Sequence, residues 1–113
     1  TVSEEEVSFV EEVGAVIEEH LGDPDFTVGQ LAKEVALSRR QLGRRLKQAA
    51  GKTPSEFIRT YRLQHAKARL ETDPPTIAEV AYTVGFRSPS HFTQTFQEQV
   101  GCTPSTYVEE HTE

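Results

Sequence analysis

Five cationic side chains occur within nine residues near the middle of the chain: Arg39, Arg40, Arg44, Arg45 and Lys47. An arginine guanidinium is planar and always charged, and it can donate two hydrogen bonds at once to the O6 and N7 atoms of guanine or to a phosphate. A lysine ammonium supplies a compact positive charge that suits phosphate oxygens. The chemistry available to this cluster is therefore the recognition of nucleic acid, provided that a helix holds the side chains on one exposed face.

The distribution of charge decides whether such a partner is plausible. The whole chain has a net charge of −6, which argues against nucleic acid. Residues 1–25, however, have a net charge of −9, residues 26–72 of +8 and residues 73–113 of −5. A phosphate backbone responds to the field within about 10 Å, because salt screens charges that lie further away. The basic middle third is therefore compatible with a nucleic acid partner.

Helix-start signals recur along the chain. In five places a Ser or Thr is followed three residues later by Glu or Gln, the spacing of a capping box: Ser3, Thr27, Ser38, Thr53 and Thr76. Ser88-Pro89 and Thr103-Pro104 add two starts with proline at the first helical position. Stops are marked by Gly22-Asp23-Pro24, Gly51, Asp73-Pro74-Pro75, Gly85 and Gly101. We expect an all-α fold with helices near residues 4–21, 27–35, 38–50, 54–71, 76–83, 88–100 and 104–111.

The chain contains an internal repeat, in which residues 27–58 correspond to residues 76–108. The copies share their apolar residues, caps and breakers, and they differ in the exposed residues between them. Each copy is a short helix, a tight turn and a second helix, which is the pattern of a helix-turn-helix. Within a single domain, residues 1–113, we expect these parts: an acidic capping helix at 4–21, a first helix-turn-helix at 27–50, a linker helix at 54–71, a second helix-turn-helix at 76–100 and a C-terminal helix at 104–111.

The turns and the apolar stripes predict how these helices pack. Gly85 lies in the second turn, where a residue without Cβ can adopt a left-handed conformation, and Ala36 holds the equivalent, less relaxed place in the first turn. The first helix carries a stripe that we expect to cap the first unit: Val10, Val13, Ile17 and Leu21. The linker helix carries its own expected buried side: Phe57, Ile58, Tyr61, Ala66 and Leu70.

In a helix-turn-helix the second helix enters the major groove of DNA. Leu42 and Leu46 should point inward, which leaves Arg39, Arg40, Gly43, Arg44 and Lys47 on the opposite side. We expect Arg40 and Arg44, one turn apart, to read bases, and Arg39 and Lys47 to contact phosphates. Arg45, beside the buried face, is ambiguous. A solvated basic helix face is the alternative interpretation of the cluster.

The linker helix could add backbone contacts to those of the first unit. Its candidates are Arg59 and Arg62. For Arg62, an ion pair with Glu34 or Glu79 is the alternative.

The second unit offers hydrogen-bonding side chains in place of charges. Phe92 and Phe96 should be buried, and the outward residues are Ser90, His91, Thr93, Gln94 and Gln97, with Arg87 in the preceding turn. Such side chains can read adenine or bridge to phosphate. We expect the first unit to supply most of the affinity and the second to supply register and modest discrimination.

Two stretches of this sequence resemble the AraC/XylS family of bacterial regulators, over roughly residues 8–110. IAEVAYTVGFRSPSHFTQTFQEQVGCTPSTY is similar to the signature region of that family, and LSRRQLGRRLKQAAGKTPSEFIRTYRLQHAKARL to its first recognition helix and linker. The resemblance implies seven helices in two homeodomain-like helix-turn-helix subdomains, binding of double-stranded DNA in successive major grooves, and activation of transcription with RNA polymerase as a partner. By position it points to Arg40, Gly43, Arg44, Ser90, His91 and Gln94.

Two features depart from the family pattern, and a third extends the resemblance. A side chain often reaches DNA from the position of Gly43, and an Arg or Lys is often found near Gln94 and Gln97. The acidic leader is similar to the segment before this domain in hybrid two-component regulators, which implies a sensor or receiver domain outside these residues. Methionine is absent, so we expect a fragment of a longer protein.

Other functions are less well supported by the residues. His20, His65, His91 and His111 lie on four different predicted helices without ligand spacing, and no phosphate loop or paired carboxylate motif occurs. We therefore expect no enzyme activity, no catalytic or metal-binding residue and no cofactor. A single cysteine, Cys102, and the lack of a signal peptide or a long apolar run favour a cytoplasmic protein without membrane contact. The alternative function is a protein-interaction module that contacts RNA polymerase or a sensor domain.

Overall fold

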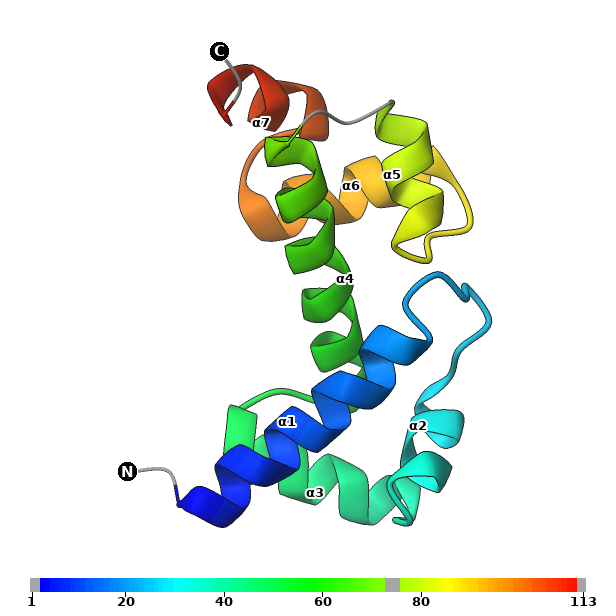
Figure 1. The fold of residues 1–113 in the computed structure, drawn as a ribbon, viewed down its shortest axis with the longest axis vertical. Coiled ribbons are helices and arrows are strands. Elements are labelled where there is room, and N and C mark those ends of the chain that lie inside the picture. Colours follow the sequence, from blue (N-terminus) through cyan, green and yellow to red (C-terminus); the bar gives the residue numbers. More distant parts are fainter. Residues whose placement is uncertain (1–2, 73–75, 112–113) are drawn as a thin grey trace. The chain divides into compact units, whose positions relative to one another are not determined.

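The computed structural model describes residues 3–72 and 76–111, and within these ranges it contains only helices (Figure 1). They are α1 (Glu4–Glu19), α2 (Val28–Glu34), α3 (Arg39–Ala50), α4 (Pro54–Glu71), α5 (Ile77–Thr83), α6 (Pro89–Val100) and α7 (Pro104–His111). The predicted all-α class and the seven predicted helices are confirmed, with starts that agree within one residue. The expected break at Asp73-Pro74-Pro75 lies outside the described residues.

Each helix begins where a hydroxyl can accept from a backbone amide. The Ser or Thr before each helix accepts a hydrogen bond from the amide three residues later, with distances of 3.0–3.2 Å. At Thr27 and Ser38 the bond is returned, because the side chains of Gln30 and Gln41 accept from the cap amides at 2.8 and 2.9 Å. Such a cap contributes about 1 kcal/mol. The caps explain why the sequence located the helix starts so closely.

The helices form two compact units that divide α4 between them. The first unit contains α1, α2, α3 and α4 as far as Tyr61, and the second contains residues 21–24, α4 from Arg62 onward, α5, α6 and α7. Each unit has its own cluster of buried apolar side chains. The two copies of the repeat therefore fold around separate cores.

The first core lies between α1, α2 and α3. Leu31, Leu42 and Leu46 are completely buried, and α1 packs against both α2 and α3, which confirms that the first helix caps this unit. The predicted stripe on α1 was incomplete. Phe9 is buried at 5% exposure, and the predicted Val10 is half-buried and packs against the same core. Phe9 and Val10 lie four and three residues before Val13, so both belong to the face of the helix that faces this core.

The second core is built around aromatic rings. Phe92 and Phe96 occupy the places that Leu42 and Leu46 hold in the first unit, and both are completely buried. Phe86 and Phe92 have ring centroids 5.2 Å apart, Phe92 and Phe96 5.6 Å, and Phe96 and Tyr107 5.5 Å. This chain of tilted and edge-on contacts is the geometry that aromatic pairs prefer.

One apolar residue was assigned to the wrong core, and another was missed. Leu21 lies beyond the end of α1 and packs against the second core instead of extending the stripe on the first. On α4, Leu63 is buried at 4% exposure although it was not predicted, and the predicted Tyr61 is half-buried against the first core. Because α4 serves two cores, its buried side does not follow one continuous stripe.

The tight turns of the two units have the same backbone conformation. Leu37 donates to the carbonyl of Ala32, and Phe86 donates to the carbonyl of Ala81, each at 2.9 Å. Ala36 and Gly85 precede these donors and have φ angles of 59° and 94°, so both adopt the predicted left-handed conformation. A Cβ on Gly85 would also overlap the carbonyl oxygen of Leu21. The second turn therefore requires glycine, whereas the first accommodates a strained alanine.

Because both turns are left-handed, glycine should be more stable than alanine in each, so the two substitutions should change the free energy of unfolding in opposite directions. Ala36→Gly should stabilise the chain by about 0.5 kcal/mol, because relief of a left-handed alanine outweighs the added entropy of the unfolded glycine. Gly85→Ala should destabilise it by about 2 kcal/mol or more, because backbone strain and overlap add. Urea unfolding of the variants and the parent measures both. Two effects of the same sign would show that the turns are not equivalent.

Candidate nucleic-acid interface

The exposed face of α3 brings together the residues predicted for the first unit. Leu42 and Leu46 fix the buried side of this helix. Arg39, Arg40, Arg44 and Lys47 are all exposed, and Gly43 is half-buried. Positions 40, 43, 44 and 47 follow the three- and four-residue spacing of one helix face. The structure thus gathers Arg40, Arg44 and Lys47 on the side of α3 opposite the core. Arg39 precedes Leu42 by three residues and is exposed at the start of the helix, with its side chain beside Gly29.

The start of α3 is electrostatically unfavourable for the isolated chain. Arg39 and Arg40 lie in its first turn, and no acidic residue accompanies them there. A helix N-terminus carries about half a positive charge, so stability favours Asp or Glu at these positions. The first turn of α1, by contrast, contains Glu4, Glu5 and Glu6. An external anion, such as a phosphate, would stabilise two arginines at a positive helix end.

Gly43 is not required by packing. A Cβ built on this residue would come no closer than 4.0 Å to any neighbouring group, the nearest being Cδ of Pro54. Glycine in a helix interior costs about 1 kcal/mol relative to alanine. The glycine leaves the centre of the cationic face without a side chain, so a ligand can approach the helix backbone there.

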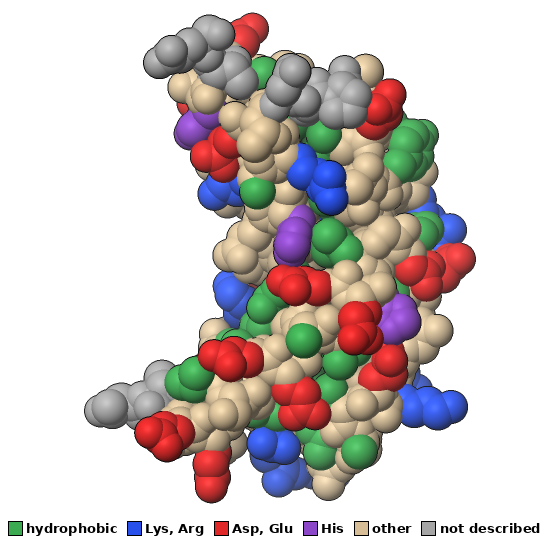
Figure 2. Space-filling model, viewed as in Figure 1, with side chains coloured by type: hydrophobic (Ala, Val, Ile, Leu, Met, Phe, Trp, Pro, Cys, Tyr) green, Lys and Arg blue, Asp and Glu red, His purple; other side chains and the backbone are tan. Residues whose placement is uncertain are grey.

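Arg45 does not share this face. Its guanidinium carbon lies 3.9 Å from the centre of the Phe9 ring, a cation–π contact with α1. The surrounding hollow is also lined by Glu4, Glu5 and Glu12. Figure 2 shows the acidic side chains gathered over α1. The ambiguous Arg45 therefore belongs to the contact between α1 and α3.

The outward face of α6 is uncharged apart from one carboxylate. Ser90, His91, Gln94 and Gln97 are exposed, Thr93 is half-buried, and Arg87 is exposed in the preceding turn. The side-chain amide of Gln94 donates to Glu98 at 3.3 Å. Glu98 was missed by the sequence interpretation, although it follows Gln94 by four residues and His91 by seven, which places it on the same face. This carboxylate strengthens the predicted difference between the two units.

The ring of His91 is partly held by the core. It meets the Phe86 ring edge-on, with centroids 5.5 Å apart. Because Phe86 is buried at 5% exposure, this contact restricts the orientation of an otherwise exposed side chain.

Arg62 has a different role from the one predicted. Its guanidinium donates to the carbonyl oxygens of Gly85 and Asp23, each at 3.0 Å, and these groups all belong to the second unit. Burial lowers the pKa of Arg62 below its usual value, and the nearby Asp23 carboxylate opposes that shift. The side chain holds two loop carbonyls against α4. The predicted pairing with Glu34 or Glu79 is therefore corrected, and Arg59, which is exposed, remains the linker-helix candidate.

The histidines predicted to be isolated are not all isolated. His20 lies beside Glu19 and Glu34, with the potential ligand atoms of the three side chains within 4.8 Å of one another. Fourteen residues separate His20 from Glu34, so spacing along the chain did not indicate the cluster.

Cys102 is half-buried against the second core. No helix in the described ranges has the length and apolar character needed to cross a bilayer.

Comparison with known proteins identifies the family. A family model described as a helix-turn-helix domain matches residues 31–110. An AraC-type regulator from Chromobacterium violaceum is 27% identical with a TM-score of 0.84, over 92% of each chain. The chain belongs to the AraC/XylS family. This AraC/XylS chain is also similar to the DNA-binding domain of the global transcriptional factor AdpA in complex with a target DNA, with 36% identity and a TM-score of 0.81, over 89% of this chain and 90% of that one.

A further relative of this AraC/XylS domain is a much longer protein. Histidine kinase P4 of Formosa agariphila is 32% identical over 113 residues, which is all of this chain and 8% of the kinase. The chain likewise spans between 28% and 33% of the regulators MtrA of Neisseria gonorrhoeae and YdeC of Bacillus subtilis. The similarity therefore concerns one domain of each relative.

The assignment of Arg62 predicts a loss of stability without its side chain. Arg62→Ala leaves two carbonyls without a charged donor and should destabilise the chain by about 2–3 kcal/mol. Arg59→Ala, three residues earlier on the same helix, should change stability by less than about 0.5 kcal/mol. Thermal and urea unfolding of both variants measure the difference. Equal effects would contradict an inward role for Arg62.

Proposed function

We propose that this domain binds double-stranded DNA sequence-specifically, as part of a bacterial transcription regulator in the cytoplasm. The observation that carries the proposal is the exposed face of α3, where Arg40, Arg44 and Lys47 lie around Gly43 and Arg39 is exposed at the helix start. These cations do not contribute to the core, and two of them oppose the helix dipole. Membership of the AraC/XylS family and the DNA complex of the AdpA domain support the same function.

Each cation of α3 has a role that follows from its position. Arg40 and Arg44, one turn apart on the open face, are the proposed base-reading residues, each able to make a bidentate contact with guanine. Arg39 at the helix start and Lys47 one turn after Arg44 are the proposed phosphate contacts. Arg59 on α4 and Arg87 in the turn before α6 are further phosphate candidates.

The second unit is proposed to supply register and modest discrimination. Ser90, His91, Thr93 and Gln97 can donate or accept hydrogen bonds without a permanent charge. Gln94 keeps one amide hydrogen and its oxygen available while Glu98 accepts the other hydrogen, and this leaves the pair of groups that reads adenine. The Glu98 carboxylate repels phosphate, so this helix should bind more weakly than α3.

The proposal extends to the two units together and to the whole protein. We propose that α3 and α6 enter successive major grooves, about 34 Å apart, and that α4 connects them. The similarity to a histidine kinase favours a hybrid two-component regulator, with the sensor and receiver outside these residues. RNA polymerase is the proposed partner in activation. No catalytic role is proposed for this domain.

Salt dependence and base preference test the role of Arg44. A site is first selected from a pool of random duplexes. Binding to it should weaken with salt with a log–log slope of about −0.9 for each phosphate neutralised. Arg44→Ala should lose about 1–3 kcal/mol on the selected site and much less on other sequences.

Arg45→Ala is the matched control, because that arginine lies on Phe9, and it should leave base preference unchanged. An equal small loss on every sequence would make Arg44 a backbone contact only. The absence of both a salt slope and a selected site would favour a protein-interaction module.

Arg40 should show a conflict between stability and binding. Arg40→Glu places an acid in the first turn of α3 and opposite Arg44 one turn later, so it should stabilise the fold by about 0.5–1 kcal/mol. The same change should reduce DNA binding more than Arg40→Ala does, because it adds a repulsive charge. Urea unfolding ranks the stabilities of the parent chain and the two variants, and duplex titration ranks their affinities for DNA. A loss of stability in Arg40→Glu would contradict the unfavourable placement of arginine at the start of α3.

A further inference from the structure

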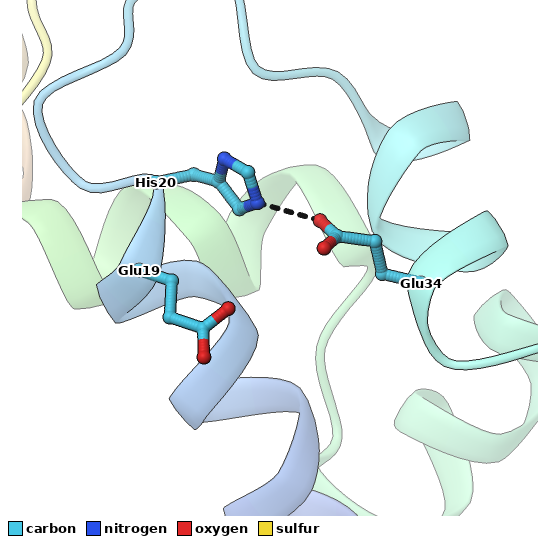
Figure 3. Close-up of side chains that lie close together, drawn as sticks. All are labelled: Glu19, His20 and Glu34. Carbon is cyan, nitrogen blue, oxygen red and sulfur yellow. Dashed lines mark ion pairs between the residues drawn. The ribbon is translucent and has the colours of Figure 1, made fainter.

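Three side chains from the ends of two helices converge in the first unit. Glu19 is the last residue of α1, His20 caps that helix, and Glu34 is the last residue of α2 (Figure 3). The His20 Nε2 atom lies 2.6 Å from a carboxylate oxygen of Glu34. The carboxylate of Glu19 completes a group whose potential ligand atoms all lie within 4.8 Å of one another.

The donor set is one imidazole nitrogen and two carboxylates. Histidine and carboxylates are ligands of zinc, which takes nitrogen at about 2.0–2.1 Å and oxygen at about 2.0–2.2 Å. Three protein ligands and a water complete a tetrahedral site. His20 and Glu34 keep 34% and 39% of their side-chain surface exposed, so their rotamers can open by the fraction of an ångström that an ion between them needs.

The imidazole is held in place by the core. The His20 ring stacks on the Phe26 ring with centroids 4.4 Å apart and planes 5° apart. Phe26 is buried at 7% exposure, so it provides a fixed support. This contact sets the plane of the imidazole and aims Nε2 toward Glu34. A ligand held in this way loses little freedom when a metal binds.

The local field favours a cation. Both α1 and α2 end here, and each helix end carries about half a negative charge in addition to the carboxylates. Within the described ranges, neither Glu19 nor Glu34 is paired with a lysine or arginine. In these ranges, His20 is therefore the basic side chain that contacts the Glu34 carboxylate, and no permanent positive charge is paired with either glutamate.

We propose that Glu19, His20 and Glu34 bind a divalent transition metal of the zinc class. The ion would join the end of α1 to the end of α2, and so attach the acidic leader to the first helix-turn-helix by a bond that depends on metal. The expectation of no metal-binding residue came from spacing along the chain, which does not reveal ligands that meet only in the fold.

Calorimetric titration of the 113-residue chain with zinc tests the site, with cobalt absorption to report a tetrahedral environment. One zinc ion should bind per chain, and thermal unfolding should move to higher temperature with zinc. His20→Phe keeps the stacking on Phe26 but removes the nitrogen ligand, and Glu34→Gln removes a carboxylate charge. Each should weaken zinc binding by about tenfold or more and abolish the thermal shift.

His111→Gln is the matched control. That histidine also stacks on an aromatic ring at a helix end, with its centroid 3.9 Å from that of Tyr107. Its removal should leave zinc binding unchanged. The proposal is overturned if zinc does not bind, or if His20→Phe binds it as tightly as the parent chain. Loss of binding in Glu34→Gln alone would indicate a simple acidic patch and would also overturn it.

Discussion

The rest of the structure depends on one constraint in each helix-turn-helix. Two apolar side chains, one turn apart on its second helix, are completely buried. Leu42 and Leu46 turn one side of α3 inward, and Phe92 and Phe96 do the same for α6. Because the helical period is fixed, the opposite side of each helix must then face outward. The tight turn before each helix and the caps at each start hold that orientation. Function is therefore free to vary on the outward side while the fold stays the same.

The two units use that freedom differently. The outward side of α3 has three exposed cations around Gly43, and that of α6 has amides, hydroxyls and one carboxylate. Salt screens charges beyond about 10 Å, so the −6 net charge of the chain says little about either surface. The acidic residues are concentrated on α1, where one arginine, Arg45, is drawn onto Phe9. The negative charge therefore lies mainly on α1, and the outward side of α3 stays positive.

Local signals in the sequence predicted most of the fold, and long-range ones were missed. Caps and breakers act over three or four residues, so the helix starts, the left-handed Ala36 and the left-handed Gly85 followed from the sequence. The exposed face of α3 followed from helical spacing. Leu21, the inward guanidinium of Arg62, and the meeting of His20 with Glu34 depend on contacts between distant segments. Spacing along the chain contains no signal for such contacts.

The shared helix α4 has a consequence for how the chain folds. The first unit uses its residues 54–61 and the second its residues 62–71, which are 8 and 10 residues of an 18-residue helix. Helices shorter than about 12–15 residues are marginal on their own, because nucleation costs more than a few turns recover. Packing against a core offsets this cost, as it does for the seven-residue helices α2 and α5. If one unit unfolded, its share of α4 would lose that packing, and the share of the other unit would lose the turns that continue it. We therefore expect the two units to stabilise one another through the backbone of one helix, and a cut between Tyr61 and Arg62 to weaken both halves.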